Sequence, residues 1–404
     1  MTLAYSTSTH RAIQQEHQYI AQTYPRPPFV LTKGQGMTVW DADGKAYLDF
    51  VAGIAVMALG HSDPDVTHAI QSQAEQLVHV SNLYYTGPQG ELAAQLCAHS
   101  FADRVFFCNS GAEANEACIK FARKFAYAHN QPDRTEVIVF SNAFHGRTLG
   151  ALSITPKPKY QDPFRPLLPD VTVLPLNDVA AAEAAIGAQT CAVVVEPVQG
   201  EGGIHVATDV FLQALRAACD QHGALLVFDE VQSGLGRTGT LWAHESSGVQ
   251  PDLMAVAKPL AAGLPMGAAL MTERVHAVLQ PGDHGSTFAG GDLVASVALT
   301  VLQKVNTPEF LAHVREVSLY LHEKLEALES PHILEVRGRG LMLGIELDFP
   351  ARDILQAGYD AGFLLVNAGP NVLRLVPPLI VDRAHIDALI TFLHDFFQKV
   401  GAQD

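Results

Sequence analysis

Near-continuous apolar runs recur through the middle of the chain, and each is followed by a segment whose apolar residues have helical spacing. The four clearest runs are Glu136–Phe140, Cys191–Val195, Ala224–Phe228 and Leu253–Ala257. Strands that are apolar on both faces are typical of a parallel sheet covered by helices. From about residue 61 to 309 the pattern therefore predicts an α/β fold with a mostly parallel central sheet and helices on both faces.

The N-terminal segment has a different pattern. Within Gly36–Phe50, two apolar runs flank Asp43 and Gly44, a pair typical of the tight turn in a β-hairpin. We expect this hairpin to be peripheral to the central sheet.

The C-terminal segment combines helical and strand patterns. A helical stretch from about residue 310 leads into Ile333–Leu347, whose Gly-rich centre predicts paired strands. Apolar positions at helical spacing then predict a terminal amphipathic helix. These positions are Ile386, Leu389, Ile390, Leu393, Phe397 and Val400. We expect residues 1–60 and 310–404 to form one small α+β domain, and residues 61–309 to form a large cofactor-binding domain.

Composition and charge remove several function classes. The 404 residues include 26 Lys and Arg against 42 Asp and Glu, a formal net charge of −16, which disfavours binding to nucleic acid. Five scattered cysteines without a C-x-x-C pair indicate neither a disulfide framework nor a zinc ribbon, and we predict no metal site. Residues 1–24 lack the pattern of a secretion signal, and no run reaches about 18 apolar residues, so we expect a cytoplasmic protein without membrane spans.

A short turn after the run Arg104–Cys108 has the composition of an anion site. Ser110 and Glu113 have the spacing of a capping box at a helix start, and Gly111 and Ala112 let a phosphate approach the backbone closely. An ordinary capped helix explains this segment equally well when it is considered alone.

Two charged side chains follow apolar strands. Asp229 comes after Ala224–Phe228, and Lys258 comes after Leu253–Ala257, where a parallel sheet exposes its strand ends to ligands. A partly desolvated amine can have a pKa low enough to form an imine with an aldehyde. A phosphate cradle, a carboxylate and this lysine together match the needs of pyridoxal phosphate.

The segment Gly234–Gly239 spells the G-x-G-x-x-G of a dinucleotide site. That fingerprint needs its first glycine directly after a strand and a helix opening on its last one. Here Asp229–Ser233 intervene and Thr-Leu-Trp follows, so the sequence favours a Gly-rich loop.

Ten motifs in order along the chain carry a family resemblance. They are Asp41–Phe50, Gly53–Val56, Gly60–His61, Ser81–Thr86, Asn109–Glu116, Phe144–Thr148, Glu196–Gly203, Asp229–Gly239, Ala257–Leu260 and His284–Phe288. The chain resembles the class III pyridoxal-phosphate aminotransferases over nearly its whole length, and among them most closely the acetylornithine aminotransferases. The resemblance implies the fold-type I architecture of pyridoxal-phosphate-dependent transferases and a homodimer with active sites at the subunit interface.

The same resemblance implies roles for residues around the cofactor ring. Lys258 would bind the cofactor covalently and move the proton between the substrate carbon and C4′ of the cofactor. Asp229 would keep the ring nitrogen protonated, which makes the ring an electron sink. Val231 and Phe144 would cover the two faces of the ring, and Gln232 would bond near its phenolic oxygen.

The phosphate would be bound by Ser110, Gly111 and Ala112, together with Thr287 from the other subunit. His145, which lies inside one of the matching motifs, is expected to be structural.

Two arginines are implied in substrate binding, because guanidinium grips carboxylates in a bidentate manner. Arg147 would take the α-carboxylate of an acylated diamino acid or the distal carboxylate of glutamate, and Arg374 the α-carboxylate of glutamate. While no glutamate is bound, Glu201 would neutralise Arg374, so that an ω-amino substrate is not repelled. Ser286 is also expected to contact the substrate.

A few positions bear on the choice of substrate. Ornithine aminotransferases have a tyrosine for the α-amino group where this chain has Ile54, which suits a neutral acylated amine better than an ammonium. Because 4-aminobutyrate enzymes also have an aliphatic residue here, this position does not separate them from acetylornithine aminotransferases. Met57 and Ala289–Asp292 depart from the family pattern, and the second departure lies beside Thr287.

The resemblance thus implies transfer of the terminal amino group of N2-acetyl-L-ornithine to 2-oxoglutarate, in arginine or lysine biosynthesis. The alternative is the same chemistry on ornithine, 4-aminobutyrate or carrier-protein-bound lysine, and a glutamate-semialdehyde mutase is a weaker one. From other classes, a nucleotide-binding oxidoreductase rests only on Gly234–Gly239. A non-catalytic binding module is opposed by the intact lysine, carboxylate and phosphate cradle.

Overall fold

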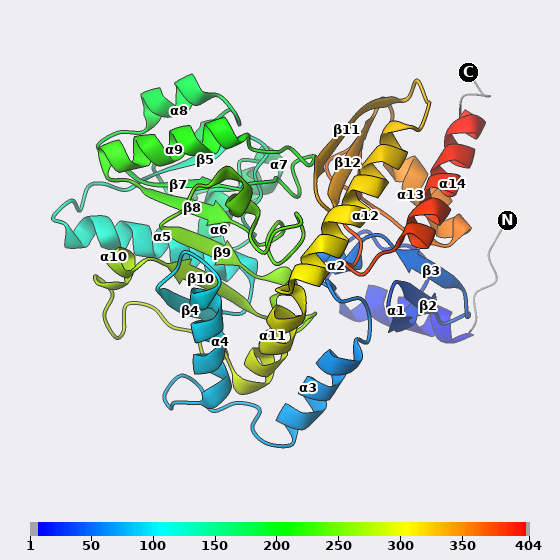
Figure 1. Cartoon of the computed structure of the whole chain (residues 1–404), viewed down its shortest axis with the longest axis horizontal. Coiled ribbons are helices and arrows are strands. Elements are labelled where there is room, and N and C mark those ends of the chain that lie inside the picture. Colours follow the sequence, from blue (N-terminus) through cyan, green and yellow to red (C-terminus); the bar gives the residue numbers. More distant parts are fainter. Residues whose placement is uncertain (1–6, 401–404) are drawn as a thin grey trace.

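The computed structural model describes residues 7–400. Figure 1 shows a large part built on one sheet and a smaller part that contains both the first helix and the last one. Helix α12 (Pro308–Glu326) runs along the smaller part where the two parts meet.

A seven-stranded sheet forms the centre of the large part. In spatial order its strands are β4 (Arg104–Cys108), β10 (Gly267–Met271), β9 (Leu253–Val256), β8 (Leu225–Asp229), β7 (Thr190–Val195), β5 (Glu136–Phe140) and β6 (Val171–Leu174). Strand β10 is antiparallel to both neighbours, and the other pairs are parallel. The predicted mostly parallel sheet is confirmed.

Helices cover both faces of this sheet. The helices of the large part are α3 (Pro64–Ala74), α4 (Gly87–Ala98), α5 (Gly111–Ala128), α6 (Leu149–Ser153), α7 (Pro158–Gln161), η1 (Asp162–Phe164), α8 (Val179–Ala185), α9 (Asp209–His222), η2 (Ala243–Ser247), η3 (Lys258–Ala261), α10 (Glu273–His276) and α11 (Asp292–Val305). Along β8, Leu226 and Phe228 share a core with α4, α9 and α11. Leu225 and Val227 point to the opposite face and share a core with α5, because successive strand residues alternate. This two-sided burial explains why the strand sequence is continuously apolar.

The small part contains two four-stranded sheets. Their strand orders are β1 (Leu31–Gln35), β2 (Thr38–Asp41), β3 (Ala46–Asp49), β13 (Phe363–Leu364), and β11 (Ile333–Arg339), β12 (Met342–Leu347), β15 (Val372–Leu375), β14 (Val366–Asn367). The remaining helices are α1 (Thr7–Tyr19), α2 (Ala52–Ala55), α13 (Arg352–Ala361) and α14 (Arg383–Val400). The predicted hairpin, paired strands and terminal helix are all present as β2–β3, β11–β12 and α14.

Both ends of the chain contribute to the small part. Strand β3 pairs in parallel with β13, with Leu48 opposite Phe363. Phe50 belongs to the same buried cluster as Leu321 and Phe397. The small α+β unit from both termini is therefore confirmed as a feature of the fold. The boundaries at residues 60 and 310 stay predictions, and residues 1–6 and 401–404 lie outside the described part.

The carboxyl ends of β7, β8 and β9 lie at one edge of the central sheet, because these neighbouring strands are parallel. Glu196 follows β7, Asp229 ends β8 and Lys258 follows β9. The fold thus brings together side chains that are far apart in the sequence.

Candidate active site

Lys258 begins the 3₁₀ turn η3 directly after β9 and Ala257. Its backbone φ is +40°, in the left-handed region, a strained conformation that clusters at functional sites. Burial lowers the pKa of Lys258 to about 8; Arg374 acts in the same direction and Glu201 opposes it. An amine with this pKa reaches its neutral, nucleophilic form close to physiological pH.

Asp229 lies one strand away from Lys258 and is 4% exposed. Its Oδ2 accepts hydrogen bonds from His145 Nδ1 and Asn115 Nδ2, each at 2.7 Å, and its Oδ1 accepts one from Val231 N–H at 3.0 Å. Within the described part of the chain Oδ1 has no further donor. It can therefore accept a second hydrogen bond, such as one from a protonated ring nitrogen.

His145 supports this carboxylate electrostatically. Burial lowers the pKa of His145, but the hydrogen bond and the negative charge of Asp229 outweigh burial and raise it above the ordinary value. The buried Nε2 of His145 has no hydrogen-bond partner among residues 7–400. Beyond the structural role expected for it, His145 thus contacts a residue that would hold the cofactor.

The start of α5 lies where the sequence predicts an anion cradle. Ser110 caps the helix, and its Oγ accepts a hydrogen bond from the Glu113 N–H at 3.2 Å. The Glu113 carboxylate accepts one from the Asn109 N–H at 2.7 Å. A Cβ on Gly111 would lie 2.6 Å from Val231, so glycine is required for the helix to start this close to the Asp229 turn. The first turn of a long helix offers N–H donors and a favourable dipole to a phosphate here.

Phe144 is fixed beside this cradle. Its N–H donates to Glu196 Oε1 at 2.9 Å, and Glu196 Oε2 accepts from the Gly200 N–H at 3.0 Å. Gly146, two residues later, packs against Ala112 of the cradle. Burial raises the pKa of Glu196 to about 7. This carboxyl group with its raised pKa therefore contacts the backbone of Phe144, the predicted aromatic wall.

A second cluster surrounds Arg374, which comes from β15 in the small part and is 1% exposed. Its Nη1 donates to Glu201 Oε1 at 2.5 Å, to the Gly200 carbonyl at 2.9 Å and to Gln232 Oε1 at 3.2 Å. Burial raises the pKa of Glu201, but the charges of Arg374 and Lys258, together with hydrogen bonds from Arg374 and Gln232, outweigh burial and lower it. The ion pair expected from the resemblance is thus present in the structure.

Arg147 is exposed, and its guanidinium lies 3.5 Å from the centroid of the Tyr160 ring and 5.5 Å from that of Phe144. It forms no ion pair with a carboxylate within the described residues. Its guanidinium is therefore available to bind the carboxylate of a substrate. Lys157 lies near the same two rings, and its Nζ donates to the Glu201 carbonyl at 2.8 Å. Three cationic side chains, Arg147, Lys157 and Arg374, therefore lie close enough to influence one another in this part of the site.

The segment with Ser286 and Thr287 borders a different cavity, of about 840 Å³. Ser286 Oγ accepts a hydrogen bond from Asn109 Nδ2 at 2.9 Å. Thr287 is exposed and makes no hydrogen bond in the described part of the chain, so its contact with the phosphate of another subunit stays a prediction. The Ala289 carbonyl accepts from Asn82 Nδ2 at 3.0 Å, which places the Ala289–Asp292 departure on the rim of this cavity.

Ile54 lies on the turn α2, which contacts η3 and therefore lies near Lys258. Its φ is +65° and its side chain is 39% exposed, so the turn presents an apolar side chain rather than burying it. The Sδ of Met57 lies 3.2 Å from the position of a Cβ on Gly263, so this departure packs against the loop after η3.

Several site residues were not predicted from the sequence. Asn115 lies four residues after Gly111, one turn along the same face of α5, and this spacing could have identified it. Glu196 follows an apolar strand just as Asp229 does, so the strand-end criterion applied to it as well. Lys157 has no comparable signal, because only the tertiary contact with Glu201 reveals it.

Two kinds of feature are absent from residues 7–400. No group of three or more His, Cys, Asp or Glu side chains is arranged to hold a metal ion. No helix is both long and apolar enough to cross a membrane.

Fold and site together define a fold-type I transferase, in which the lysine and the carboxylate occupy neighbouring strand ends of the large sheet. The family described as Aminotransferase class-III matches residues 19–397. The chain therefore belongs to the class III aminotransferases.

Named relatives agree with this family. A mitochondrial acetylornithine aminotransferase of Alnus glutinosa is 53% identical over 373 residues, covering 90% of this chain and 82% of the relative. The crystal structure of N-acetylornithine aminotransferase from Stenotrophomonas maltophilia is 39% identical, with a TM-score of 0.84 and coverage of 97% and 100%. The ornithine aminotransferase of Toxoplasma gondii, whose structure is described with partial occupancy of PLP, is 32% identical, with a TM-score of 0.94 and coverage of 98% and 95%.

Proposed function

We propose that this chain is a pyridoxal-phosphate-dependent aminotransferase that moves the terminal amino group of N2-acetyl-L-ornithine to 2-oxoglutarate. The products are N-acetyl-L-glutamate 5-semialdehyde and L-glutamate. The observation that carries this proposal is the ion pair between the buried Arg374 and the partly exposed Glu201, both of which act electrostatically on Lys258 with its lowered pKa. The names of the relatives in Alnus and Stenotrophomonas support the same substrate.

The residues present fit pyridoxal phosphate. Gly111 lets α5 start close against Val231, the α5 start supplies N–H donors with Ser110 and Ala112, and Asp229 keeps a lone pair for the ring nitrogen. When bound, the cofactor supplies an aldehyde that reacts with amines and a ring that takes up the electron pair of a deprotonated carbon.

The chain's own groups would then do the following work. Lys258 would hold the cofactor and transfer the proton at the substrate carbon that bears the amine. Val231 and Phe144 would cover the ring and exclude water, while Gln232 would bond near the phenolic oxygen. Asp229, held by His145 and Asn115, would keep the ring nitrogen protonated.

The two half-reactions need different charges on the substrate side. While Glu201 neutralises Arg374, the site would accept a donor with one carboxylate, which Arg147 would bind. A dicarboxylate such as 2-oxoglutarate would displace Glu201 and engage both arginines. Ser286 would contribute a further polar contact. Exchange of one carboxylate for another on Arg374 would thus separate donor from acceptor.

We also propose that the enzyme is a cytoplasmic homodimer. Apolar side chains next to and on the rim of the cavity with Thr287 are exposed, namely Leu83, Tyr84, Tyr85 and Phe288. Contiguous exposed apolar groups mark interaction surfaces, and burial by a second copy would bring Thr287 towards the partner's phosphate site.

A panel of amino donors with 2-oxoglutarate tests the substrate. We expect kcat/KM for N2-acetyl-L-ornithine to exceed that for ornithine by about tenfold or more, because an apolar wall disfavours the free α-ammonium of ornithine. The panel also includes 4-aminobutyrate, which has no α-amino group and is therefore not excluded by Ile54. Ile54→Tyr is the matched variant and should raise the relative efficiency with ornithine. A wild-type preference for ornithine, 4-aminobutyrate or carrier-bound lysine would replace the proposed donor. Borohydride reduction followed by peptide mapping should label Lys258.

A further inference from the structure

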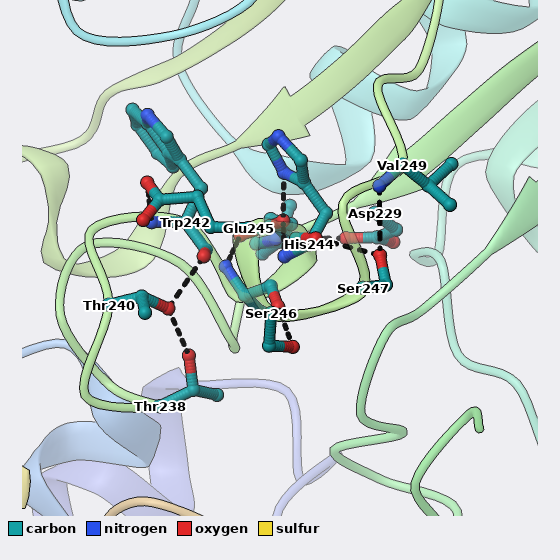
Figure 2. Close-up of polar contacts among 12 residues, drawn as sticks. Asp229, Thr238, Thr240, Trp242, His244, Glu245, Ser246, Ser247 and Val249 are labelled. Carbon is teal, nitrogen blue, oxygen red and sulfur yellow. Dashed lines mark hydrogen bonds and ion pairs between the residues drawn. The ribbon is translucent and has the colours of Figure 1, made fainter. Parts of the chain in front are cut away.

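The loop Gly234–Gly239, whose sequence mimics a dinucleotide fingerprint, connects the Asp229 turn with η2. Figure 2 shows the polar contacts that hold the chain after Asp229. The hydroxyls of Thr238 and Thr240 lie 3.4 Å apart, and Thr240 Oγ1 donates to the Trp242 carbonyl at 2.7 Å. The Gly236 N–H also donates to the Leu241 carbonyl at 3.1 Å, so the loop is held by contacts with the residues that follow it.

Arg237, in the middle of this loop, is a buried cation without an anion. It is 2% exposed and forms no ion pair within the described residues. Its Nη1 donates to the Leu341 carbonyl at 3.1 Å and to the Pro377 carbonyl at 2.5 Å, while Nη2 is buried without a partner. Burial lowers the pKa of Arg237 to about 9. Burying an unpaired charge is unfavourable. What Arg237 provides in return is two hydrogen bonds to backbone carbonyls of the small part.

The backbones of the two parts meet directly at Arg237. The Leu341 N–H donates back to the Arg237 carbonyl at 2.9 Å. A Cβ on Gly340, whose φ is +61°, would lie 2.5 Å from that same carbonyl oxygen. A Cβ on Gly236 would lie 3.2 Å from the side chain of Leu379 in the small part. The glycines of the loop and of its partner thus serve close packing between the two parts.

The segment Gln232–Arg237, which leads into the loop, contacts β15 and the residues that follow it at two points. Gln232 Oε1 accepts a hydrogen bond from Arg374, and five residues later Arg237 donates to Pro377, three residues after Arg374. Asp229 precedes Gln232 by three residues in the same continuous segment. One segment therefore connects the residue for the cofactor nitrogen with the guanidinium on the substrate side.

We propose that Arg237 is a positioning residue that holds Pro377, and with it β15, so that Arg374 stays in register with Gln232 and Glu201. In this way Arg237 sets the affinity of the site for a dicarboxylate, although it touches neither cofactor nor substrate. The inference rests on the proposed function, in which Arg374 binds a carboxylate of 2-oxoglutarate.

The test compares Arg237→Met and Arg237→Lys with Arg315→Met in the holoenzyme. Arg315 is the matched control, because its Nη1 donates to the Gly239 carbonyl of the same loop at 2.8 Å but does not bind the Pro377 segment. We expect Arg237→Met to raise KM for 2-oxoglutarate about tenfold, since small misplacements of a binding group are costly, while KM for the donor changes less than about twofold. Arg237→Lys should lie between Arg237→Met and the wild type, and Arg315→Met should match the wild type.

A readout that does not depend on turnover is the dissociation constant of glutarate, a dicarboxylate without a reactive carbonyl, measured by spectral titration. It should rise about tenfold in Arg237→Met and stay unchanged in Arg315→Met. Equal rises in KM for donor and acceptor, or unchanged glutarate affinity, would overturn the proposal. If Arg237→Met does not fold, Arg237→Lys decides by the same two criteria. Failure of the proposed function would instead show in the wild type, as absence of turnover with every ω-amine donor.

Discussion

The site has two sides that are held in different ways. The cofactor side contains Asp229 and Lys258, and the substrate side contains Arg374 and Glu201. Asp229 and Lys258 lie at neighbouring strand ends of one sheet, and Asp229 is fixed by three donors at 2.7 to 3.0 Å. Arg374 comes from another sheet, and one of its partners is the carboxylate of Glu201, a loop side chain that is 26% exposed. The Asp229–Lys258 side thus has fixed contacts, whereas in the proposed function the Arg374–Glu201 side would use charges that exchange partners.

The largest expected effect tests the fixed side. Lys258→Ala should lower kcat/KM by about 10⁴-fold or more, and by similar factors for all donors, because the proton transfer has no substitute. Turnover with several donors, checked against unchanged far-UV circular dichroism, measures this. A loss confined to one donor would place Lys258 on the substrate side instead and would break the contrast.

An intermediate effect concerns the pH at which the fixed side becomes reactive. Burial lowers the pKa of Lys258 to about 8, so its proton leaves at lower pH than in a solvated lysine. The rate at which apoenzyme takes up pyridoxal phosphate should rise about 50-fold between about pH 6 and pH 8 and then level off, as the neutral fraction does. A rate that still climbs about tenfold between about pH 8 and pH 9 would indicate an ordinary lysine pKa. Stopped-flow absorbance measures it.

The smallest expected effect tests the substrate side. Glu201→Gln leaves Arg374 without its counter-charge, so kcat/KM for N2-acetyl-L-ornithine relative to that for glutamate as donor should fall about tenfold. Glu335→Gln, which removes an exposed partner of Arg337 outside the site, is the control and should leave the ratio unchanged. An unchanged ratio in Glu201→Gln would mean that the substrate side is as fixed as the cofactor side.

Much of the fixed side could be predicted from the sequence. Continuous apolar runs identified the central strands to within one or two residues, and β5 coincides with the predicted Glu136–Phe140. The charged residues after these runs then identified Asp229 and Lys258, because parallel strands expose their carboxyl ends at one edge. Helical spacing from Gly111 would have added Asn115.

The substrate side could be predicted only through the resemblance. Nothing in the pattern near Arg374 distinguishes it from a surface arginine, yet it is 1% exposed. The cations Lys157 and Arg237 have no local signal either, since their partners lie 44 and 104 or more residues away.

By itself the sequence determined the elements, the strand ends that carry the lysine and the carboxylate, and the capped helix start, because each depends on side-chain periodicity or on neighbours within a few residues. Only the tertiary structure decided which charges meet. The pairing of Arg374 with Glu201, of His145 with Asp229 and of Arg237 with Pro377 depends on how separate elements pack. Electrostatic and hydrogen-bond contacts act over a few ångströms in space, whatever the distance along the chain.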